Sequence, residues 1–173
     1  GSLAPTCPDR TAPGRTLLGS DQEAWLGEGL ASSPATWDVL ANQIVMTSMP
    51  FAGQFYNPDQ WDGYAAARAR VLQLATDAPV DNLVVLSGDI HAAGIADLVG
   101  ENPDGTPSTV AVGTELVGGS ISSTFDPALA DAAEELILQL PHVRFADTHQ
   151  RGYMVCDATA DELVTRYQVV EST

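Results

Sequence analysis

The stretch LVVLSGDIH, residues 83–91, decides most of what the sequence predicts about the fold. Its first four residues, Leu83–Leu86, are all apolar, which is typical of a strand buried on both faces. A Ser-Gly pair ends the strand, and a carboxylate (Asp89) and an imidazole (His91) follow two positions apart. In extended backbone such residues point to the same side. We therefore expect both side chains at the carboxyl end of a core strand, where open α/β sheets bind ligands.

The pair formed by Asp89 and His91 has the chemistry of metal ligands. An oxygen donor beside a nitrogen donor suits a metal ion of intermediate hardness. The pattern alone leaves other roles open, because an Asp after Gly also ends strands and a single His also serves as a structural residue. A catalytic metal normally takes at least three ligands from protein. The remaining ligands are therefore expected elsewhere in the chain or outside it.

Composition limits the classes of partner. With 173 residues the chain is long enough for one domain with a real core, and no apolar stretch reaches the ~20 residues that span a bilayer. The formal net charge is −16, and the seven basic residues are all Arg. Such an acidic chain repels nucleic acids and anionic membranes. A phosphate substrate would need a bound metal to offset this charge.

The chain ends and the cysteines bear on localisation. No secretory leader pattern opens the sequence, so we expect either that an export signal has been removed or that the chain is part of a longer protein. Cys7 and Cys156 are compatible with a disulfide, which would indicate export. They are also compatible with two unpaired thiols, which is the alternative we favour.

The first half of the chain alternates helices and strands. Residues 1–14 predict an irregular arm or linker, and residues 15–173 predict the domain. Ser20 and Glu23 fit a capping box that opens a helix. Residues 37–46 are mostly apolar and predict a strand, interrupted by Asn42, whose amide either satisfies backbone groups or faces a site. A helix is expected after Trp61, running through residue 74.

Antiparallel strands dominate the second half. Residues 95–99 and 109–114 predict a hairpin around the turn at 102–105. Glu115 follows as a possible metal ligand or hydrogen-bond acceptor, although a surface carboxylate is the more common role. Asp126 predicts a helix N-cap before Pro127. Residues 143–146, 153–156 and 163–170 predict closing strands that end in an antiparallel meander. The whole order predicts a layered α/β fold with mixed sheets.

The succession of short motifs resembles the C-terminal half of the alkaline phosphatase D (PhoD-like) family, which belongs to the metallophosphoesterase superfamily. The resemblance begins near Arg15 and covers nearly all of the chain. The motifs that carry it are, in chain order, Arg15–Gly19, Gln22 with Trp25-Leu26, Trp37 leading into Asn42-Gln43, Asp59 with Trp61–Tyr64 and Arg68, Gly88–His91, Glu115, Ser120–Ser123, Pro141-His142 and Arg151–Tyr153.

This resemblance implies a calcineurin-like α/β/β/α sandwich with a metal cluster between its sheets, of which the chain is the C-terminal half. It implies hydrolysis of phosphate monoesters or diesters by a metal-activated water, outside the cytoplasm, with iron and calcium as the expected metals and other divalent metals possible. By the same resemblance Asp89 and His91 are the last metal ligands and catalytic residues, and Asn42 and Glu115 are near-site residues.

The family's earlier ligands lie in Gly-Asp and Gly-Asn motifs of an N-terminal half, and no such motif precedes Asp89. The resemblance therefore implies a missing N-terminal half as the partner of this chain, which alone is expected to be inactive. Two other functions stay open. One is an exported, non-catalytic binding module with a degenerate metal site, in which the aromatic residues of 51–64 bind a ligand. The other is a metallohydrolase that acts on esters or lactones.

Overall fold

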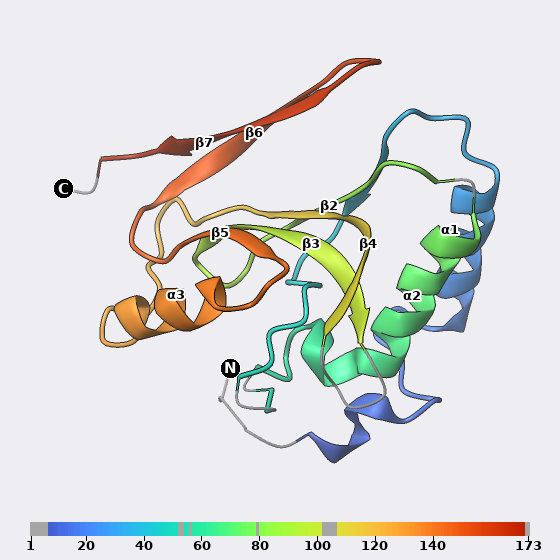
Figure 1. The fold of residues 1–173 in the computed structure, drawn as a ribbon, viewed down its shortest axis with the longest axis horizontal. Coiled ribbons are helices and arrows are strands. Elements are labelled where there is room, and N and C mark those ends of the chain that lie inside the picture. Colours follow the sequence, from blue (N-terminus) through green and yellow to red (C-terminus); the bar gives the residue numbers. More distant parts are fainter. Residues whose placement is uncertain (1–6, 52–53, 56, 79, 102–106, 172–173) are drawn as a thin grey trace.

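A five-stranded mixed sheet organises the protein. The computed structural model describes residues 7–51, 54–55, 57–78, 80–101 and 107–171. The strand order is β1-β2-β4-β3-β5, in which β1, β2 and β4 are parallel and β3 is antiparallel to both of its neighbours (Figure 1). The strands are β1 (Asp38–Ala41), β2 (Leu83–Ser87), β3 (Ala93–Glu101), β4 (Pro107–Val117) and β5 (Val143–Asp147).

The apolar run at residues 83–86 forms β2, as predicted. It lies between β1 and β4, so both of its edges are paired. Leu83, Val84 and Val85 are all buried, so side chains on both faces of the strand are covered. The strand predicted over residues 37–46 is wrong beyond Ala41, where β1 ends. After Ala41 the chain leaves the sheet, because side chains from other elements bind the backbone groups that a longer strand would have paired.

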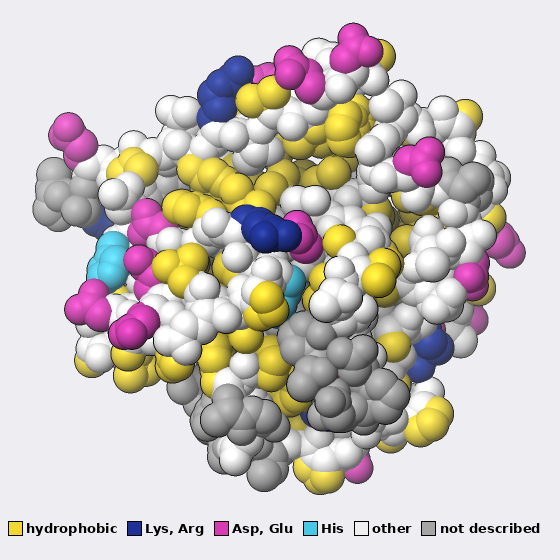
Figure 2. Space-filling view, viewed as in Figure 1, with side chains coloured by type: hydrophobic (Ala, Val, Ile, Leu, Met, Phe, Trp, Pro, Cys, Tyr) yellow, Lys and Arg dark blue, Asp and Glu magenta, His cyan; other side chains and the backbone are white. Residues whose placement is uncertain are grey.

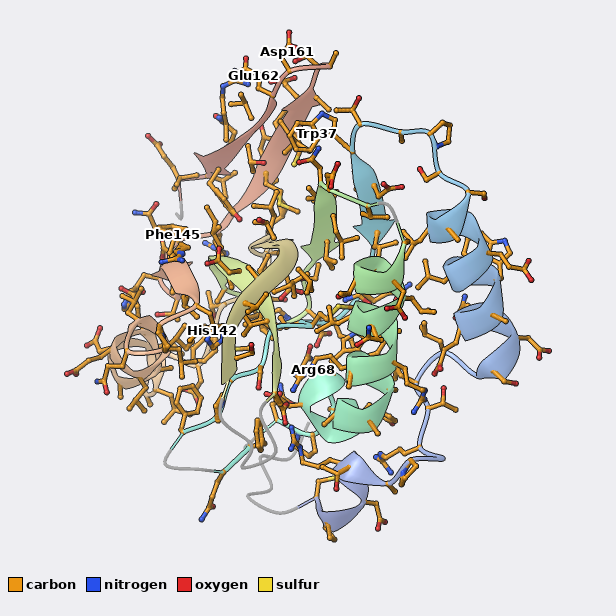
Figure 3. The ribbon with its side chains drawn as sticks, turned by 45° about the vertical axis from the view of Figure 1, so that its right-hand side comes forward. Trp37, Arg68, His142, Phe145, Asp161 and Glu162 are labelled. Carbon is orange, nitrogen blue, oxygen red and sulfur yellow. The ribbon has the colours of Figure 1, made fainter. Side chains whose placement is uncertain are left out.

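Helices lie on both sides of the sheet. Figures 1 and 3 show α1 (Ser20–Ala31) and α2 (Ala65–Asp77) side by side on one side and α3 (Ala130–Leu138) on the other. Two 3-10 turns, η1 (Pro8–Thr11) and η2 (Trp61–Tyr64), complete the elements. The helix expected after Trp61 is confirmed. The core between α2 and the sheet consists of Leu30, Met46, Trp61, Ala67, Val71, Leu72, Ala75, Leu83, Val85 and Leu98.

Both helices predicted from capping residues form, but the two predicted side-chain caps are wrong. The residue before α1 is Gly19, with φ of 84°, so Ser20 is the first helical residue and no side chain caps the helix. The carboxylate of Glu23 instead accepts hydrogen bonds from Thr16 and from an arginine of α2. Asp126 does not cap α3 either. Its carboxylate accepts the Ala128 N–H at 2.9 Å, which closes a turn ahead of the helix.

The predicted hairpin of residues 95–99 and 109–114 is confirmed as β3 and β4, while its turn at 102–105 lies outside the described residues. The last two strands, β6 (Gly152–Ala158) and β7 (Leu163–Val169), form a separate antiparallel pair. β5 pairs with β3 instead of β6.

The β6–β7 pair extends from the main sheet, and hydrogen bonds attach it to the rest of the protein. The N–H of Gly152 donates to the carbonyl of Ser120 at 2.9 Å. The indole N–H of Trp37 donates to the carbonyl of Thr159 at 2.7 Å, and Figure 3 shows Trp37 beside this hairpin. The hydroxyl of Tyr167 donates to the carbonyl of Gly94 at 2.7 Å. Strand β7 is thus attached to β3 at one end, and the hairpin turn is attached next to β1 at the other.

Acidic and hydrophobic side chains are distributed differently on the surface. On the face shown in Figure 2, acidic side chains lie mostly around the periphery, and hydrophobic side chains gather nearer the centre. Cys7 and Cys156 are both free, which agrees with the unpaired-thiol alternative. No described helix is both long enough and apolar enough to cross a membrane.

Candidate functional site

The carboxyl ends of three parallel strands meet at one edge of the sheet. The N–H of Asn42, just after β1, donates to the carbonyl of Leu86 in β2 at 2.8 Å. The N–H of Gly118, just after β4, donates to the carbonyl of Ser87 at 2.8 Å. Asp89 and His91 follow β2 at this edge. The structure therefore places the pair where we expected it, beyond the carboxyl end of a core strand that lies between two parallel neighbours.

The backbone of this loop differs from the extended geometry that we assumed. Asp89 has φ of 74° and His91 has φ of 59°, and these are the two described non-glycine residues with positive φ. The argument that residues two apart in extended backbone share a side is thus wrong here. Asp tolerates the left-handed region better than most residues, but such a conformation still costs about 1–3 kcal/mol and is most frequent at functional sites. Both side chains are exposed to solvent.

Gln60 connects this exposed loop to the protein interior. Its Nε2 donates to Oδ2 of Asp89 at 2.7 Å, and its Oε1 accepts the N–H of Val45 at 2.5 Å. The side chain is only 4% exposed. Sequence reasoning missed Gln60, because its partners lie 15 and 29 positions away and no local pattern marks it.

The amide of Asn42 is engaged within the fold. Its Nδ2 donates to the carbonyl of Ile44, and its Oδ1 accepts the indole N–H of Trp61 at 3.2 Å. Asn42 therefore satisfies backbone groups just after a strand, which is one of the two roles expected from the sequence. The bond to the buried Trp61 also fixes the place where the chain leaves β1.

Glu115 is fully buried, so the surface position expected for it is wrong. Its Oε1 accepts hydrogen bonds from the N–H of Met46 and the hydroxyl of Ser87, each at 2.7 Å. Its Oε2 accepts the N–H of Thr47 at 2.7 Å. A buried carboxylate is stable in a protein when such donors surround it. Glu115 thus joins β4 and β2 to the chain that follows β1.

Residues 44–49, which we call the crossing segment, run past the end of the sheet without joining a strand ladder. Buried backbone groups need partners, and here most of them are side chains. Asn42, Gln60 and Glu115 supply the bonds described above. Asp62 accepts the N–H of Met49 at 3.0 Å, and the guanidinium of Arg68 donates to the carbonyl of Met46 at 3.2 Å.

Four charged side chains next to the crossing segment form an ion cluster, namely Arg10, Asp62, Arg68 and Glu101. Arg68 is 2% exposed and bonds Asp62 at 2.6 Å, and it also contacts Glu101. Arg10 bonds Glu101 at 2.8 Å. Because Asp62 and Arg68 also bind the crossing segment, this cluster fixes the segment and, through Gln60, the loop that carries Asp89.

His142 is a second buried residue to which the sequence assigned no role. Its Nε2 lies 2.8 Å from the carbonyl of Ser48, so Nε2 carries the proton and donates. Burial lowers the pKa of this imidazole. Among the described residues, the other ring nitrogen and the hydroxyl of Thr47 are the buried side-chain polar atoms without a hydrogen-bond partner. Burial therefore favours the neutral form of the ring, with the proton on Nε2.

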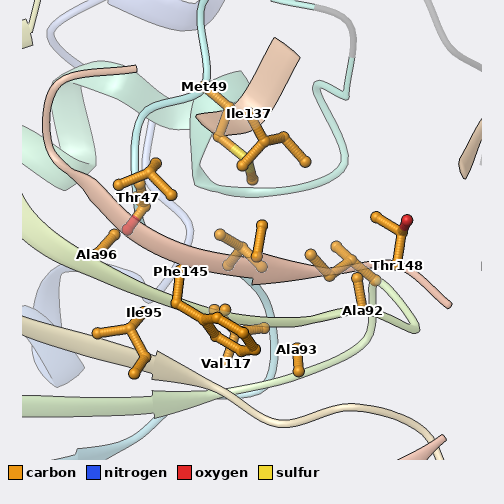
Figure 4. Close-up of a pocket in the computed structure, with 15 residues that line it drawn as sticks. Thr47, Met49, Ala92, Ala93, Ile95, Ala96, Val117, Ile137, Phe145 and Thr148 are labelled. Carbon is orange, nitrogen blue, oxygen red and sulfur yellow. The ribbon is translucent and has the colours of Figure 1, made fainter. Parts of the chain in front are cut away.

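An apolar pocket lies next to the loop. It is bounded by the crossing segment, by β3 and β5, and by Ile137 of α3 (Figure 4). Ile90, which stands between Asp89 and His91 in sequence, is one of its lining residues, together with Met49 and Phe145. The candidate site therefore has an exposed carboxylate and imidazole on one side and an apolar wall beside them.

The donor set fits part of a metal site. Within the described part of the chain, no group of three or more His, Cys, Asp and Glu side chains is placed to hold a metal ion. Asp89 and His91 offer one oxygen and one nitrogen from a strained loop, which suits a metal but leaves it without the third protein ligand that catalytic sites normally have. Further ligands would have to come from residues outside these 173.

Comparisons with known proteins identify the family of this chain. The family model described as PhoD-like phosphatase matches residues 2–167. The chain belongs to the PhoD-like phosphatase family. It is 38% identical over 162 residues to alkaline phosphatase D of Bacillus subtilis (strain 168), a match that covers 91% of this chain and 27% of that relative. This confirms the family resemblance seen in the sequence.

A solved structure titled "Structure of PhoD" has the same fold as this chain. The TM-score is 0.74 at 29% sequence identity, and the match covers 100% of this chain and 38% of that one. The mixed α/β fold expected from the sequence is thereby confirmed. The chain spans about a quarter to two-fifths of the length of these PhoD-like relatives.

Proposed function

We propose that this chain supplies one side of the active site of a metal-dependent phosphoester hydrolase. The observation that carries the proposal is the place of Asp89 and His91, two positions apart on a strained loop at the carboxyl ends of three parallel strands. Membership of a phosphatase family supports the reaction class. The remaining ligands would come from chain outside these 173 residues.

Asp89 and His91 would hold the metal, which when bound polarises phosphoryl oxygens and lowers the pKa of a water. Iron and calcium are the metals expected from the resemblance, and phosphate monoesters or diesters are the expected substrates. The rest of this chain holds the two ligands in place. Glu115 binds the crossing segment and Ser87, the last residue of β2 before the loop that carries these ligands. The apolar pocket lies next to this loop, with Ile90 in its wall.

The acidic surface fits this proposal only with a bound metal. A net charge of −16 repels a phosphate ester. Metal ions are usually the largest local charges in their sites and would reverse the local sign. We also propose an extracytoplasmic location, on the strength of the resemblance alone. Fractionation of the native cells, with the protein detected by antibody, tests that location.

The function is tested with Asp89→Asn and His91→Ala in the complete natural protein that carries this chain. We expect both variants to lose bound metal and to hydrolyse p-nitrophenyl phosphate and bis(p-nitrophenyl) phosphate orders of magnitude more slowly. Asp161→Asn and His149→Ala are matched controls, because both residues are exposed and lie on other loops.

Three other results would count against the proposal. If Asp89→Asn and His91→Ala both keep the wild-type metal content and hydrolysis rate, Asp89 and His91 are not part of the site. A complete protein without metal or turnover would favour the non-catalytic binding module. Turnover of carboxylic esters or lactones, without turnover of phosphate esters, would favour the other class of metallohydrolase.

A further inference from the structure

We infer that Gln60 is the positioning residue that orients the carboxylate of Asp89 for metal binding. The inference deepens the proposed function and rests on it. Metal-binding carboxylates are usually hydrogen-bonded to outer partners, which fix their orientation and tune the site. Gln60 is the described residue that makes such a bond to Asp89 from the protein interior.

The orientation of the Gln60 amide follows from its other partner. A backbone N–H can only donate, so the oxygen of the amide must face the N–H of Val45. The NH₂ group then faces Asp89, whose Oδ2 lies 2.7 Å away. One carboxylate oxygen of Asp89 is thereby held by a neutral donor, and the other oxygen is left to bind a cation.

The interior fixes Gln60 firmly. Its side chain is 4% exposed, whereas Asp89 is exposed. The next residue, Trp61, is 1% exposed and donates its backbone N–H to the carbonyl of Val45 at 3.2 Å. Gln60 and Trp61 therefore bind both polar groups of Val45. An exposed loop carboxylate gains a defined position because its partner cannot move.

The substitution Gln60→Glu separates the two bonds. A carboxylate oxygen still accepts the N–H of Val45, but the donor facing Asp89 becomes a second acceptor. Gln73→Glu is the matched control. Gln73 donates to Oδ1 of Asp77 at 2.7 Å on the exposed face of α2, so the same chemical change is made beside an aspartate away from the site.

The assay measures Co²⁺ binding by the metal-free complete natural protein, followed by visible absorption. We expect Gln60→Glu to weaken Co²⁺ binding by about 10–100-fold relative to wild type, and Gln73→Glu to bind as wild type does. Equal affinities for Gln60→Glu and Gln73→Glu would overturn the inference. If Gln60→Glu does not fold, Gln60→Met, which adds no charge, takes its place with the same expected loss and the same overturning result.

A second readout needs no metal. In the double variant Gln60→Glu/Asp89→Asn the donor and acceptor are exchanged, so the hydrogen bond can form again. We expect the metal-free double variant to unfold at a higher urea concentration than Gln60→Glu alone, while its Co²⁺ affinity stays low. No recovery of the urea midpoint would overturn the inference.

The variant Asp89→Asn distinguishes a failure of the proposed function from a failure of the positioning role of Gln60. If it leaves Co²⁺ affinity at the wild-type value, the proposed function fails and the role of Gln60 fails with it. If it lowers the affinity while Gln60→Glu does not, only the positioning role fails.

Discussion

The carboxylate of Glu115 on β4 accepts the hydroxyl hydrogen of Ser87 on β2, with 2.7 Å between the two oxygens. The same carboxylate binds two backbone N–H groups of the crossing segment. One fully buried side chain therefore joins two neighbouring parallel strands to the irregular chain that passes their ends. The loop with Asp89 starts directly after Ser87, so this joint also sets where that loop begins.

Glu115→Ala should destabilise the fold strongly, because it leaves three buried donors without an acceptor. Each unsatisfied buried group costs about 1–3 kcal/mol, so we expect a loss of at least about 3 kcal/mol in equilibrium urea unfolding. Ser87→Ala removes one donor and should cost about 1 kcal/mol. A Glu115→Ala midpoint equal to that of wild type would show that these bonds contribute nothing.

Arg68→Met should also be costly, because it leaves the buried carboxylate of Asp62 without its arginine, while Glu101 keeps Arg10. Removal of one partner of a buried ion pair costs about 3–5 kcal/mol. Arg166→Met is the control. Arg166 contacts Asp157 on the exposed face of the β6–β7 hairpin, and exposed pairs contribute less than about 1 kcal/mol. Similar unfolding midpoints for the two variants would contradict the buried-cluster argument.

His142 should make stability depend on pH below about 6.5. Burial lowers its pKa from 6.5 in the folded protein, with Arg68 lowering it further and the nearby Asp97 and Asp62 acting against this. As the pH falls, the unfolded chain takes up the proton first, so the free energy of unfolding decreases. His142→Gln keeps a donor for Ser48 and should flatten the stability profile below about pH 6.5. If the free energy of unfolding, measured with urea, depends on pH equally in His142→Gln and in wild type, the prediction is contradicted.

Replacement by alanine should lower the stability of the protein at one glycine and raise it at another. A Cβ on Gly63 would lie 1.8 Å from the carbonyl oxygen of Pro58, so Gly63→Ala must move backbone next to Gln60. We expect it to lower the thermal midpoint by several degrees or more. Gly29 lies in α1 with open space around its Cβ position, and Gly29→Ala should stabilise by about 0.5–1 kcal/mol. Calorimetry on both variants checks the pair.

The elements that sequence predicted best are those with local signals. The four apolar residues of β2 need no partner to be recognised, and their position fixes Asp89 and His91 at a strand end. The hairpin of β3 and β4 was predictable from strand patterns on either side of a strong turn. Each of these strand signals lies within one short stretch of sequence, where hydrophobic patterning is informative.

The residues that sequence could not place depend on distant partners. Glu115 reads as an ordinary strand-end carboxylate, but its donors lie 28, 68 and 69 positions away. The carbonyl that binds His142 is 94 positions away. Residues 44–46 look like strand because they are apolar, and only the fold reveals that side chains bind their backbone. The left-handed backbone at His91 likewise has no sequence signal.

The crossing segment has a consequence for folding kinetics. Its side-chain partners lie on η2, α2, β4 and the residue before β5, so its bonds can close only after those elements have assembled. Contacts of such long sequence separation form late. Substitutions in residues 44–49 should therefore speed unfolding and leave the refolding rate nearly unchanged. The surroundings of Asp89 would then be the last part of the molecule to acquire native order.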